Sequence, residues 1–501
     1  MGSARRTALA SVAVAAALTG AGAAAASSTA SSTATPAQAQ VNGARTPVVF
    51  ISLDEFSLAS LLRAPGEIDA RRYPSFAALA RQSTWFANTT PSGDGTRWAT
   101  PAVLAGVLPD KRRIPIASDY PRSVFTLLGG THRFIVQEPL TRLCPASLCR
   151  GHTLPGRTRK QKAQALNALI PVEKKHAAKR SELADFIARL RPWRSGRAPF
   201  YYIDVLMPHH PYVWLPSGRR YIPPKPEIPG LYGDNMWRNN PTLVDRAWQR
   251  YLLQVGYTDL LIGRLIRKMK ATGLWDRALL VILPDHGVSF VPGNSRRMAT
   301  RVTLGGIGVI PLFMKLPGQT LGRRVDEHVQ TIDVLPTVAD ALDLPAPRGI
   351  DGHSALDPGF KPSDRAELWS TTSVATFGRH LYPMSLVTRR FAELISRQSA
   401  QFGTGARGAR FFDLGPGAAL VGRAASALPA GSARLTASLD GPPKGGPAVV
   451  SGRVGRVGSG RLLAVVIRGR VAATTRTYVF RGVRFEAAVP RGGPVAVYAV
   501  G

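Results

Sequence analysis

Two apolar runs that each lead into residues of metal-ligand type constrain the fold more than any other feature of the sequence. Residues 46–56, TPVVFISLDEF, carry Asp54 and Glu55 near their end, and ILPDHGVSF carries Asp285 and His286. Each run has the apolar, β-branched character of a strand that is buried on both faces of a parallel sheet. Ligands of open α/β sheets bind beyond the carboxyl ends of the strands. The sequence therefore predicts that two remote strands bring these four residues to one edge of a sheet.

Further apolar strands alternate with amphipathic helices along the chain. This alternation predicts an α/β fold, in which helices cover both faces of a mostly parallel central sheet. The longest expected helix covers residues 243–272, where Leu253, Tyr257, Leu261 and Leu265 share one face. The other expected strands are residues 134–138, 200–206, 277–283 and 308–315, and the other expected helices are residues 73–83 and 331–342.

The first forty residues have the layout of a secretory signal. A basic start with Arg5 and Arg6 precedes an Ala/Val-rich run, and small residues lead to a cleavage site expected before Gln40. The arginine pair leaves a twin-arginine route open, and an uncleaved single anchor is another alternative. No later stretch is long and apolar enough to cross a bilayer. We expect a protein exported to the cell envelope or secreted.

The rest of the chain divides into three parts. Residues 45–360 carry the alternating strands and helices, and residues 361–430 complete or connect this core. Residues 431–501 differ, since short Val/Ala/Thr-rich runs alternate there with Gly-Pro turns. This pattern predicts a small antiparallel β domain. The domain either caps the core or binds wall polymer or glycan.

The chain is strongly basic, with 65 Lys and Arg against 31 Asp and Glu and a formal net charge of +34. An arginine-rich coding bias explains this excess without any function. The functional alternative is attraction to anionic wall polymers, lipid headgroups or phosphorylated substrates, with peripheral membrane contact compatible with it. The basic residues are scattered and have no zinc-finger or RNP-like motif beside them, so we expect no nucleic-acid partner. Composition does not indicate an oligomeric state.

The two cysteines, Cys144 and Cys149, flank a Pro-Ala-Ser turn in RLCPASLCR. In an exported protein such a pair predicts a small-loop disulfide. A zinc site is the alternative, but it needs more thiol or imidazole ligands nearby.

A polar loop precedes an apolar helical segment in TTPSGDGTRWATPAVLAGVLP, residues 89–109. The hydroxyl of Thr96 is expected near the start of this helix, where free N–H groups and the helix dipole favour an anion. A helix N-cap is the structural alternative for this threonine.

In the order of its motifs, the sequence resembles the alkaline phosphatase superfamily, and sulfatase-like proteins in particular. The resemblance covers about residues 46–356. The motifs that carry it are VVFISLDEF, YPSFAALARQSTWFANTT, LMPHHPYVWLPSGRRY, LLQVGYTDLLIGRL, LPDHGVSF, VIPLFMKLPGQ and TIDVLPTVADALDLPAP followed by GIDG. YPSFAALARQSTWFANTT corresponds to a helix and turn of the family.

The resemblance implies a nucleophile and a metal site. In the superfamily the nucleophile lies ten positions before a glycine that ends an apolar segment, and counting back from Gly106 gives Thr96. One divalent ion (Mn, Zn, Ca or Mg, not distinguished) would be held by Asp54, Asp285, His286 and Thr96. Glu55 either joins these ligands or lies outside them. His328 and His353 remain for a second ion, but no complete second set can be assembled from the sequence.

Four further residues are candidates for contact with the substrate. His209, in MPHHPY, resembles the family's substrate-facing histidine and is the expected general acid for the leaving group, and His210 is the alternative for that position. Arg97, beside Thr96, and Lys315, after the strand VIPLFM, are candidates for binding the substrate anion. The structural alternative for Lys315 is a solvated lysine at a strand end.

The residues around Thr96 favour phosphate over sulfate. Classical sulfatases carry Cys or Ser in a Cys/Ser-x-Pro-x-Arg motif that matures to formylglycine, whereas this chain has TRWAT. A threonine is similar to the nucleophile of phosphodiesterases and phosphoglycerol transferases in the superfamily. We expect a metal-dependent hydrolase or transferase of anionic esters, with envelope glycolipid and wall polymer as candidate substrates. The alternatives are a sulfatase without formylglycine and an inactive, sulfatase-like envelope-binding protein.

Overall fold

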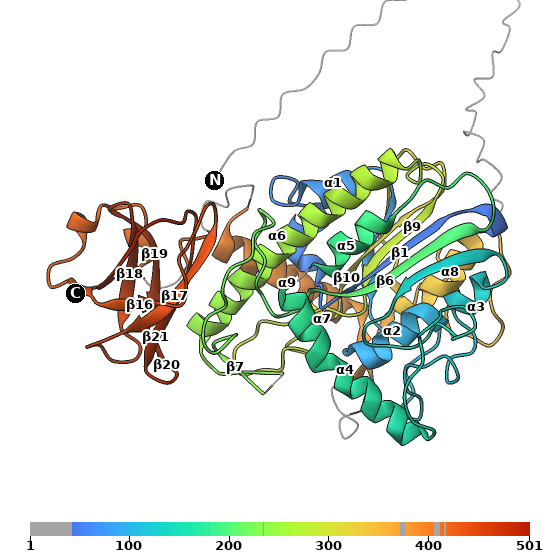
Figure 1. The fold of residues 1–501 in the computed structure, drawn as a ribbon, viewed down its shortest axis with the longest axis horizontal. Helices are drawn as coiled ribbons and strands as arrows, with labels where there is room; N and C mark the ends of the chain where they lie inside the picture. The colour runs from blue at the N-terminus through green and yellow to red at the C-terminus, as the bar shows by residue number, and fades with distance from the viewer. Residues whose placement is uncertain (1–42, 180, 234, 371–376, 405–410, 415–416) are drawn as a thin grey trace, which may run out of the picture. The chain divides into compact units, whose positions relative to one another are not determined.

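An eight-stranded sheet forms the centre of the protein (Figure 1). The computed structural model describes residues 43–501 except 180, 234, 371–376, 405–410 and 415–416. The strands of this sheet are β1 (Val48–Asp54), β4 (Thr84–Thr90), β5 (His132–Gln137), β6 (Ala198–Pro208), β9 (Leu279–Pro284), β10 (Ile310–Lys315), β11 (Arg323–Val325) and β12 (Val329–Gln330). Their order is β11-β4-β10-β9-β1-β6-β5, with β12 also paired to β4.

The sheet is mostly parallel, as the alternating pattern predicts. β5, β6, β1 and β9 are parallel neighbours, whereas β10 pairs antiparallel with both β9 and β4. The five strands expected from apolar runs are all present, each within a few residues of its expected range. Residues of β4 were expected in a turn, and this expectation was wrong: Trp85 and Phe86 are buried in the sheet, where β10 pairs with them.

Helices cover both faces of the sheet. The helices are α1 (Pro74–Ala80), α2 (Thr96–Ala105), α3 (Val124–Leu128), α4 (Arg159–Lys179), α5 (Glu182–Arg189), α6 (Pro241–Ala271), α7 (Leu304–Ile307), α8 (Val334–Ala341) and α9 (Met384–Phe402). Alternate residues of β1 point to opposite faces. Val49 and Ile51 pack in one cluster with α1, α5, α6 and α9, and Val48 and Phe50 pack in another with α2, α3 and α8.

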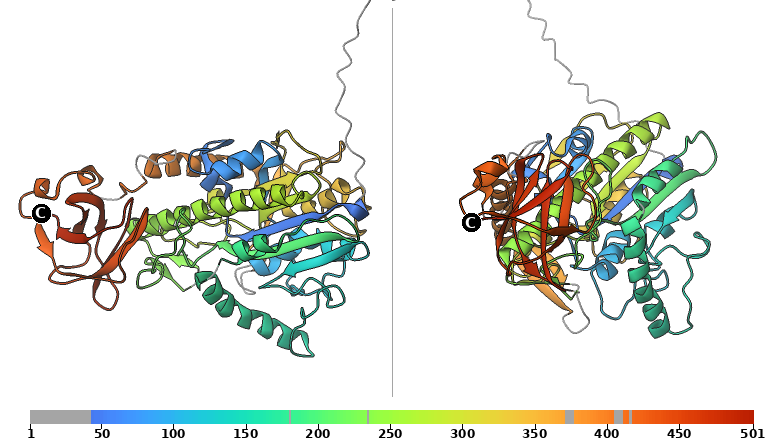
Figure 2. Two further views of the ribbon diagram at one scale, coloured as in Figure 1. Left: turned by 45° about the horizontal axis from the view of Figure 1, so that its top comes forward. Right: turned by 60° about the vertical axis from the view of Figure 1, so that its left-hand side comes forward.

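The long helix α6 supplies much of the first cluster. Its start is fixed by Asn240, whose side chain accepts a hydrogen bond from the Leu243 N–H, and by Pro241 at the first helical position. Leu253, Tyr257 and Leu261 are buried on the predicted face. α6 lies along the sheet in Figures 1 and 2 and supports the segment that follows β6.

Residues after about 430 form antiparallel sheets, as expected. The strands are β15 (Ala433–Leu435), β16 (Ala437–Leu439), β17 (Ala448–Val454), β18 (Leu462–Ile467), β19 (Arg470–Arg476), β20 (Tyr478–Val479), β21 (Val483–Val489) and β22 (Val495–Ala499). They pair as β15-β22-β18-β19 and β16-β17-β21-β20, with an apolar core between the sheets, and make the two-layered red unit of Figure 2. The expected boundaries at residues 360 and 430 stay predictions.

Three two-stranded sheets complete the described structure. They are β2 (Leu62–Ala64) with β3 (Glu67–Ile68), β7 (Leu231–Tyr232) with β8 (Met236–Trp237), and β13 (Arg365–Ser370) with β14 (Gly378–Pro383). The signal-like residues 1–40 lie outside the described residues. Within the described part of the chain, none of the helices has the length and apolar character that crossing a membrane requires.

Candidate active site

Asp54, Asp285 and His286 converge where β1 and β9 end. β1 and β9 are parallel neighbours in register up to Leu53 and Pro284, so the residue after each pair reaches the same edge. The Asp285 N–H donates to the Leu53 carbonyl at 3.0 Å, which fixes the two chain ends side by side. His286 Nε2 lies 3.7 Å from Asp54 Oδ1 and 3.7 Å from Asp285 Oδ2. The sequence prediction that remote strands would bring these residues together agrees with this geometry.

The three side chains have the arrangement that a divalent cation needs. Their ligand atoms lie within 4.8 Å of one another, and all three residues are buried. Both carboxylate oxygens of Asp54, Asp285 Oδ2 and His286 Nε2 have no hydrogen-bond partner among the described residues. Buried polar atoms without partners are costly, so a cluster of them facing one point fits a metal ion. Carboxylate and imidazole ligands suit zinc and manganese alike.

Burial without a cation changes the protonation of the cluster. Burial, together with the neighbouring carboxylates of Asp285 and Glu55, raises the pKa of Asp54 to about 8. Burial raises the pKa of Asp285 to about 7, although the nearby Thr96 side chain lowers it. Burial also lowers the pKa of His286, which favours the neutral imidazole that binds metals. The cluster is therefore an acid pair that a cation would have to deprotonate.

Thr96 begins α2 and its hydroxyl is directed to the cluster. The helix N-cap is Gly95, which makes no side-chain cap bond, so the N-cap alternative for Thr96 does not apply. The Thr96 side chain instead lies close to the Asp285 carboxylate and lowers its pKa. α2 ends at Gly106, whose φ of 63° is the left-handed C-terminal conformation that favours glycine. The ten-residue spacing from Thr96 to Gly106 thus equals the length of one helix.

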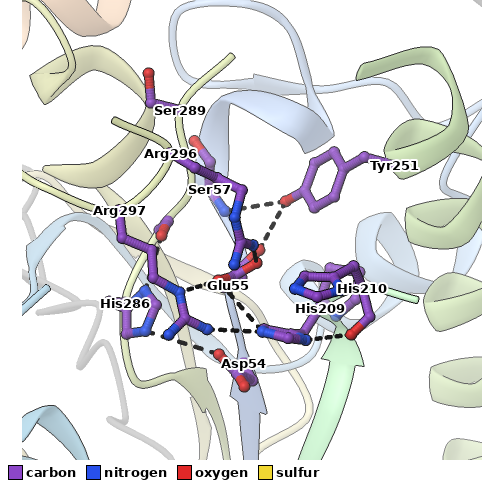
Figure 3. A network of polar contacts seen from close by, with 12 residues as sticks. Asp54, Glu55, Ser57, His209, His210, Tyr251, His286, Ser289, Arg296 and Arg297 are labelled. Atoms are coloured by element: carbon purple, nitrogen blue, oxygen red, sulfur yellow. Dashed lines mark hydrogen bonds and ion pairs between the residues drawn. The ribbon is translucent and has the colours of Figure 1, made fainter. Parts of the chain in front are cut away.

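Glu55 is bound by two arginines that the sequence analysis missed. Arg296 Nη1 donates to Glu55 Oε2, and Arg297 Nε donates to Glu55 Oε1 at 2.5 Å (Figure 3). Burial alone would raise the pKa of Glu55, but the two guanidinium groups hold it at about 2. Glu55 also has a φ of 60°, a strained conformation for a residue with a side chain. Its assignment as a metal ligand stays a prediction, since Asp54, Glu55 and His209 also lie within ligand distance of one another.

In the sequence, only the position of Arg296 and Arg297, shortly after Asp285 and His286, points to a place in the site. They lie 11 and 12 residues after Asp285 in NSRRMAT, a loop with no periodic pattern, in a chain with 65 basic residues. The loop returns to the site because the Ser289 N–H donates to the Arg296 carbonyl at 2.9 Å. A basic pair shortly after an Asp-His pair is the one signal that the sequence offered.

His209 and His210 lie beside the carboxylate cluster, at the end of β6. Their rings are stacked, with centroids 4.3 Å apart. His209 Nε2 is 2.6 Å from Arg297 Nη2 and 3.5 Å from Glu55 Oε1. The His209 N–H donates to the Asp54 carbonyl at 3.1 Å, so β6 delivers this histidine to the end of β1. His209 contacts both Arg297 and Glu55, and the charge of His210 also helps to lower the pKa of Glu55.

Two predicted substrate-binding residues are not brought into this cluster. Lys315 pairs with Leu280 near the start of β9, because β10 runs antiparallel; its ammonium lies over the Trp275 ring at 5.0 Å. The assignment of Lys315 to the substrate anion is therefore corrected: the lysine lies at the opposite edge of the sheet. Arg97 follows Thr96, but its guanidinium lies over the Trp98 ring at 5.2 Å. Among the described residues it has no contact with the Asp54 cluster.

Two smaller predictions have clear outcomes. The disulfide is confirmed: Cys144 and Cys149 are bonded, with Cα atoms 6.0 Å apart. His328 bonds instead to the Thr90 hydroxyl at 2.8 Å and to the Ser363 carbonyl at 2.8 Å. The described residues form no second metal-ligand group around it.

The sequence of the core matches a known family. Residues 160–344 match the sulfatase family model, a stretch that contains His209, Asp285 and His286 and begins after Asp54 and Thr96. This match, the mostly parallel sheet and the acid–histidine cluster agree with the resemblance to the alkaline phosphatase superfamily.

Individual relatives match only part of the chain. It is 34% identical over 121 residues to the multifunctional alkaline phosphatase superfamily protein PehA of Trinickia caryophylli, and this match covers 22% of each chain. It is 27% identical over 121 residues to an ulvan-active sulfatase of Formosa agariphila, with 24% of each chain covered. The matches thus span about a fifth to a quarter of these relatives. Among solved structures, the phosphonate monoester hydrolase of Agrobacterium radiobacter has a TM-score of 0.48 and 16% identity, over 70% of this chain and 91% of that one.

Proposed function

We propose that the protein is an exported, metal-dependent hydrolase of phosphate esters that uses Thr96 as its nucleophile. The observation that carries the proposal is the place of Thr96, which begins α2 close to the Asp285 carboxylate and lowers its pKa, at the edge where Asp54 and His286 also converge. A helix-start threonine that only capped its helix would have no reason to face a buried carboxylate. The signal-like N-terminus and the disulfide support export.

The residues of the site divide the chemistry between them. Asp54, Asp285 and His286 would hold one divalent ion, which would lower the pKa of the Thr96 hydroxyl and offset charge on the substrate oxygens. Thr96 Oγ attacks phosphorus, so an O–P bond forms and the bond to the leaving oxygen breaks, while the hydroxyl proton passes to water. Arg297 is placed to bind a non-bridging oxygen, and His209 to protonate the leaving group. Water then cleaves the phosphothreonine, which releases phosphate and restores the hydroxyl.

The residues around Thr96 favour phosphate esters over sulfate esters. TRWAT lacks the cysteine or serine that sulfatases convert to formylglycine. Transfer would use the same phosphothreonine. It would differ from hydrolysis only in the last step, where an acceptor hydroxyl attacks in place of water. The basic surface is compatible with an anionic envelope polymer or glycolipid as substrate.

The experiment compares Thr96→Ala with Thr100→Ala, a buried threonine one helical turn further along α2. Purified proteins are loaded with Mn²⁺ or Zn²⁺ and assayed on p-nitrophenyl phosphate, bis-p-nitrophenyl phosphate and p-nitrophenyl sulfate. We expect Thr96→Ala to lose about a thousandfold or more in kcat on phosphate esters, as nucleophile removal does in other enzymes. Thr100→Ala should lose little.

Three results would contradict the proposal in different ways. Retained turnover in Thr96→Ala would exclude this nucleophile. Turnover of the sulfate alone would favour a sulfatase, and no turnover by any metal-loaded wild-type protein would favour a binding protein. Mass spectrometry of the quenched reaction should locate the phosphoryl group on the peptide that contains Thr96.

A further inference from the structure

A basic cavity lies far from the candidate active site, at the opposite end of the sheet. Three segments line it: the start of β5, the disulfide loop around Cys149, and residues 192–197, which lead from α5 into β6. Its volume is about 970 Å³, well above what a single phosphate would fill. The cavity is therefore of a size to hold several linked units of a ligand.

Strand β6 separates the cavity from the active site. Ala198, next to the cavity, starts β6, and His209 of the active site follows its last residue. Eleven residues of extended strand at about 3.3 Å each give roughly 35 Å between them. A small ester bound at Thr96 does not reach the cavity, but a polymer can contact both places.

The cavity is lined by positively charged side chains that have no acidic partners in the described structure. Its lining includes Arg133, Arg150, Arg194 and Arg197, all exposed, and among the described residues no carboxylate lines it or pairs with these four arginines. Some exposed arginines elsewhere have acidic partners, as Arg379 has in Glu367 at 2.8 Å. Others, such as Arg434 and Arg453, have none within the described part of the chain. The cavity differs in bringing four unpaired guanidinium groups around one hollow.

A tryptophan adds a specific hydrogen-bonding group to this charge. Trp193 is half-buried, and its buried Nε1 has no acceptor among the described residues. Arg277 holds the residue in place, since its Nη1 donates to the Trp193 carbonyl at 2.9 Å and its guanidinium lies 4.8 Å from the ring centroid. An oxygen-rich ligand would supply the acceptor that this indole N–H lacks.

One wall of the cavity is covalently fixed. The Cys144–Cys149 disulfide closes the loop directly before Arg150. The Cys149 N–H donates to the Pro145 carbonyl at 2.9 Å, and His152 lies 3.3 Å from Glu138. A loop fixed in this way loses little further conformational entropy when a ligand binds.

We propose that this cavity binds a segment of an anionic polysaccharide, through sulfate, phosphate or carboxylate groups on its sugar units. Guanidinium forks match such oxyanions in geometry, and four of them around one cavity fit a repeating anion rather than a single one. A sugar also carries hydroxyls for the indole N–H. Nucleic acid fits less well, because single strands bind on series of stacking aromatic rings. Of the rings that line this cavity, Trp193 already carries Arg277, and Phe134 packs edge-on against Phe200. The site is separate from the proposed chemistry and does not depend on it.

The test measures polymer binding by the full chain with and without two of the arginines. The variant is Arg194→Ala/Arg197→Ala, and the control is Arg434→Ala/Arg453→Ala, which removes the same charge from exposed positions of the C-terminal strands. Binding to heparin (sulfate and carboxylate), hyaluronate (carboxylate only), neutral dextran and single-stranded DNA is followed by fluorescence anisotropy at several salt concentrations. Trp193→Phe serves as a third variant, which keeps an aromatic ring, though a smaller one, and removes the indole N–H.

We expect the cavity variant to bind heparin about tenfold more weakly than wild type, with a smaller salt dependence, while the control changes little. Trp193→Phe should also bind more weakly, and turnover of small phosphate esters should be unchanged in all variants. Equal losses in the cavity and control variants would show a general charge effect and overturn the proposal. Tighter binding of DNA than of either anionic polysaccharide would also overturn it, in favour of a nucleic-acid site.

Discussion

Arg297 and His209 are joined in the site, with Arg297 Nη2 2.6 Å from His209 Nε2. A guanidinium only donates hydrogen bonds, so His209 Nε2 must accept, and the ring proton lies on Nδ1, which contacts the His210 carbonyl. The same guanidinium donates from Nε to Glu55. His209 is therefore set as a neutral imidazole while Arg297 holds it, and it can act as an acid only after a substrate draws the arginine away and Nε2 takes up a proton.

This relationship predicts that Arg297 affects both substrate binding and the pH dependence of turnover. Arg297→Ala should lower kcat/KM on phosphate esters by about a hundredfold, the usual effect of removing one charged donor from a reaction site. Arg297→Lys should recover only part, because an ammonium cannot join Glu55 and His209 as a planar fork does. The pH profile of kcat/KM should change in Arg297→Ala, since His209 would lose the donor on Nε2.

The matched control is Arg301→Ala, an exposed arginine four residues along the same loop. It should keep wild-type kcat/KM and pH profile. If Arg297→Ala behaves like Arg301→Ala, the arginine has a structural role only.

The acidic cluster predicts that the metal-free protein loses stability as the pH rises. Burial raises the pKa of Asp54 to about 8 and that of Asp285 to about 7, both above the value near 3.8 of an unfolded aspartate. Between pH 4 and 8 the folded chain then binds more protons than the unfolded chain, so its stability falls as the pH increases. A divalent ion replaces these protons, and its stabilising effect should be larger at pH 8 than at pH 5.

Melting temperatures in a chelator and in Mn²⁺ or Zn²⁺, measured from pH 5 to pH 8, test this prediction. Asp54→Asn should flatten the pH dependence of the chelated protein and reduce the metal-induced shift. Asp364→Asn, at a side chain that is 93% exposed, should leave both unchanged. A metal-induced shift that is the same at all pH values would contradict the assignment of this cluster as the site.

Gly287 lies next to His286, and we expect that a side chain at this position would disturb the packing of the site. The φ of Gly287 is not positive, so no left-handed turn requires a glycine there. It is required instead by close packing, since a Cβ there would lie 2.2 Å from the Gly306 carbonyl oxygen of α7. Gly287→Ala should destabilise the protein by about 1–3 kcal/mol or more, because backbone on both sides has to shift. It should also weaken metal binding through His286.

Gly130→Ala is the control, because a Cβ at Gly130 meets no atom within 4 Å. Its effect on the midpoint of urea unfolding should be small, about 0.5 kcal/mol or less. A Gly287→Ala protein as stable as Gly130→Ala would show that α7 does not pack against the site as described.

The features that could be predicted from sequence are those that short-range patterns encode. Apolar runs indicate the strands β1 and β9, and the acids after them indicate the site, because parallel strands share an edge. The direction of β10 is not encoded in its own residues, and this is why Lys315 was assigned to the wrong edge. Arg296 and Arg297 were missed for a related reason: only the tertiary path of an irregular loop brings them to Glu55.

Arg250 and Glu486 form a buried pair between α6 and the C-terminal strands, and we expect this pair to stabilise the protein. Arg250 of α6 lies 3.5 Å from Glu486 of β21, and both side chains are almost fully buried. Arg250 also donates to the carbonyls of Glu227 at 2.8 Å and Tyr212 at 3.0 Å. Glu486→Gln keeps the shape but leaves the guanidinium with neutral acceptors only, and should destabilise the protein by about 1–3 kcal/mol. Glu67→Gln removes the acid of an exposed pair with Arg63 and should cost at most about 1 kcal/mol, so urea midpoints that rank these two variants in the opposite order would contradict the prediction.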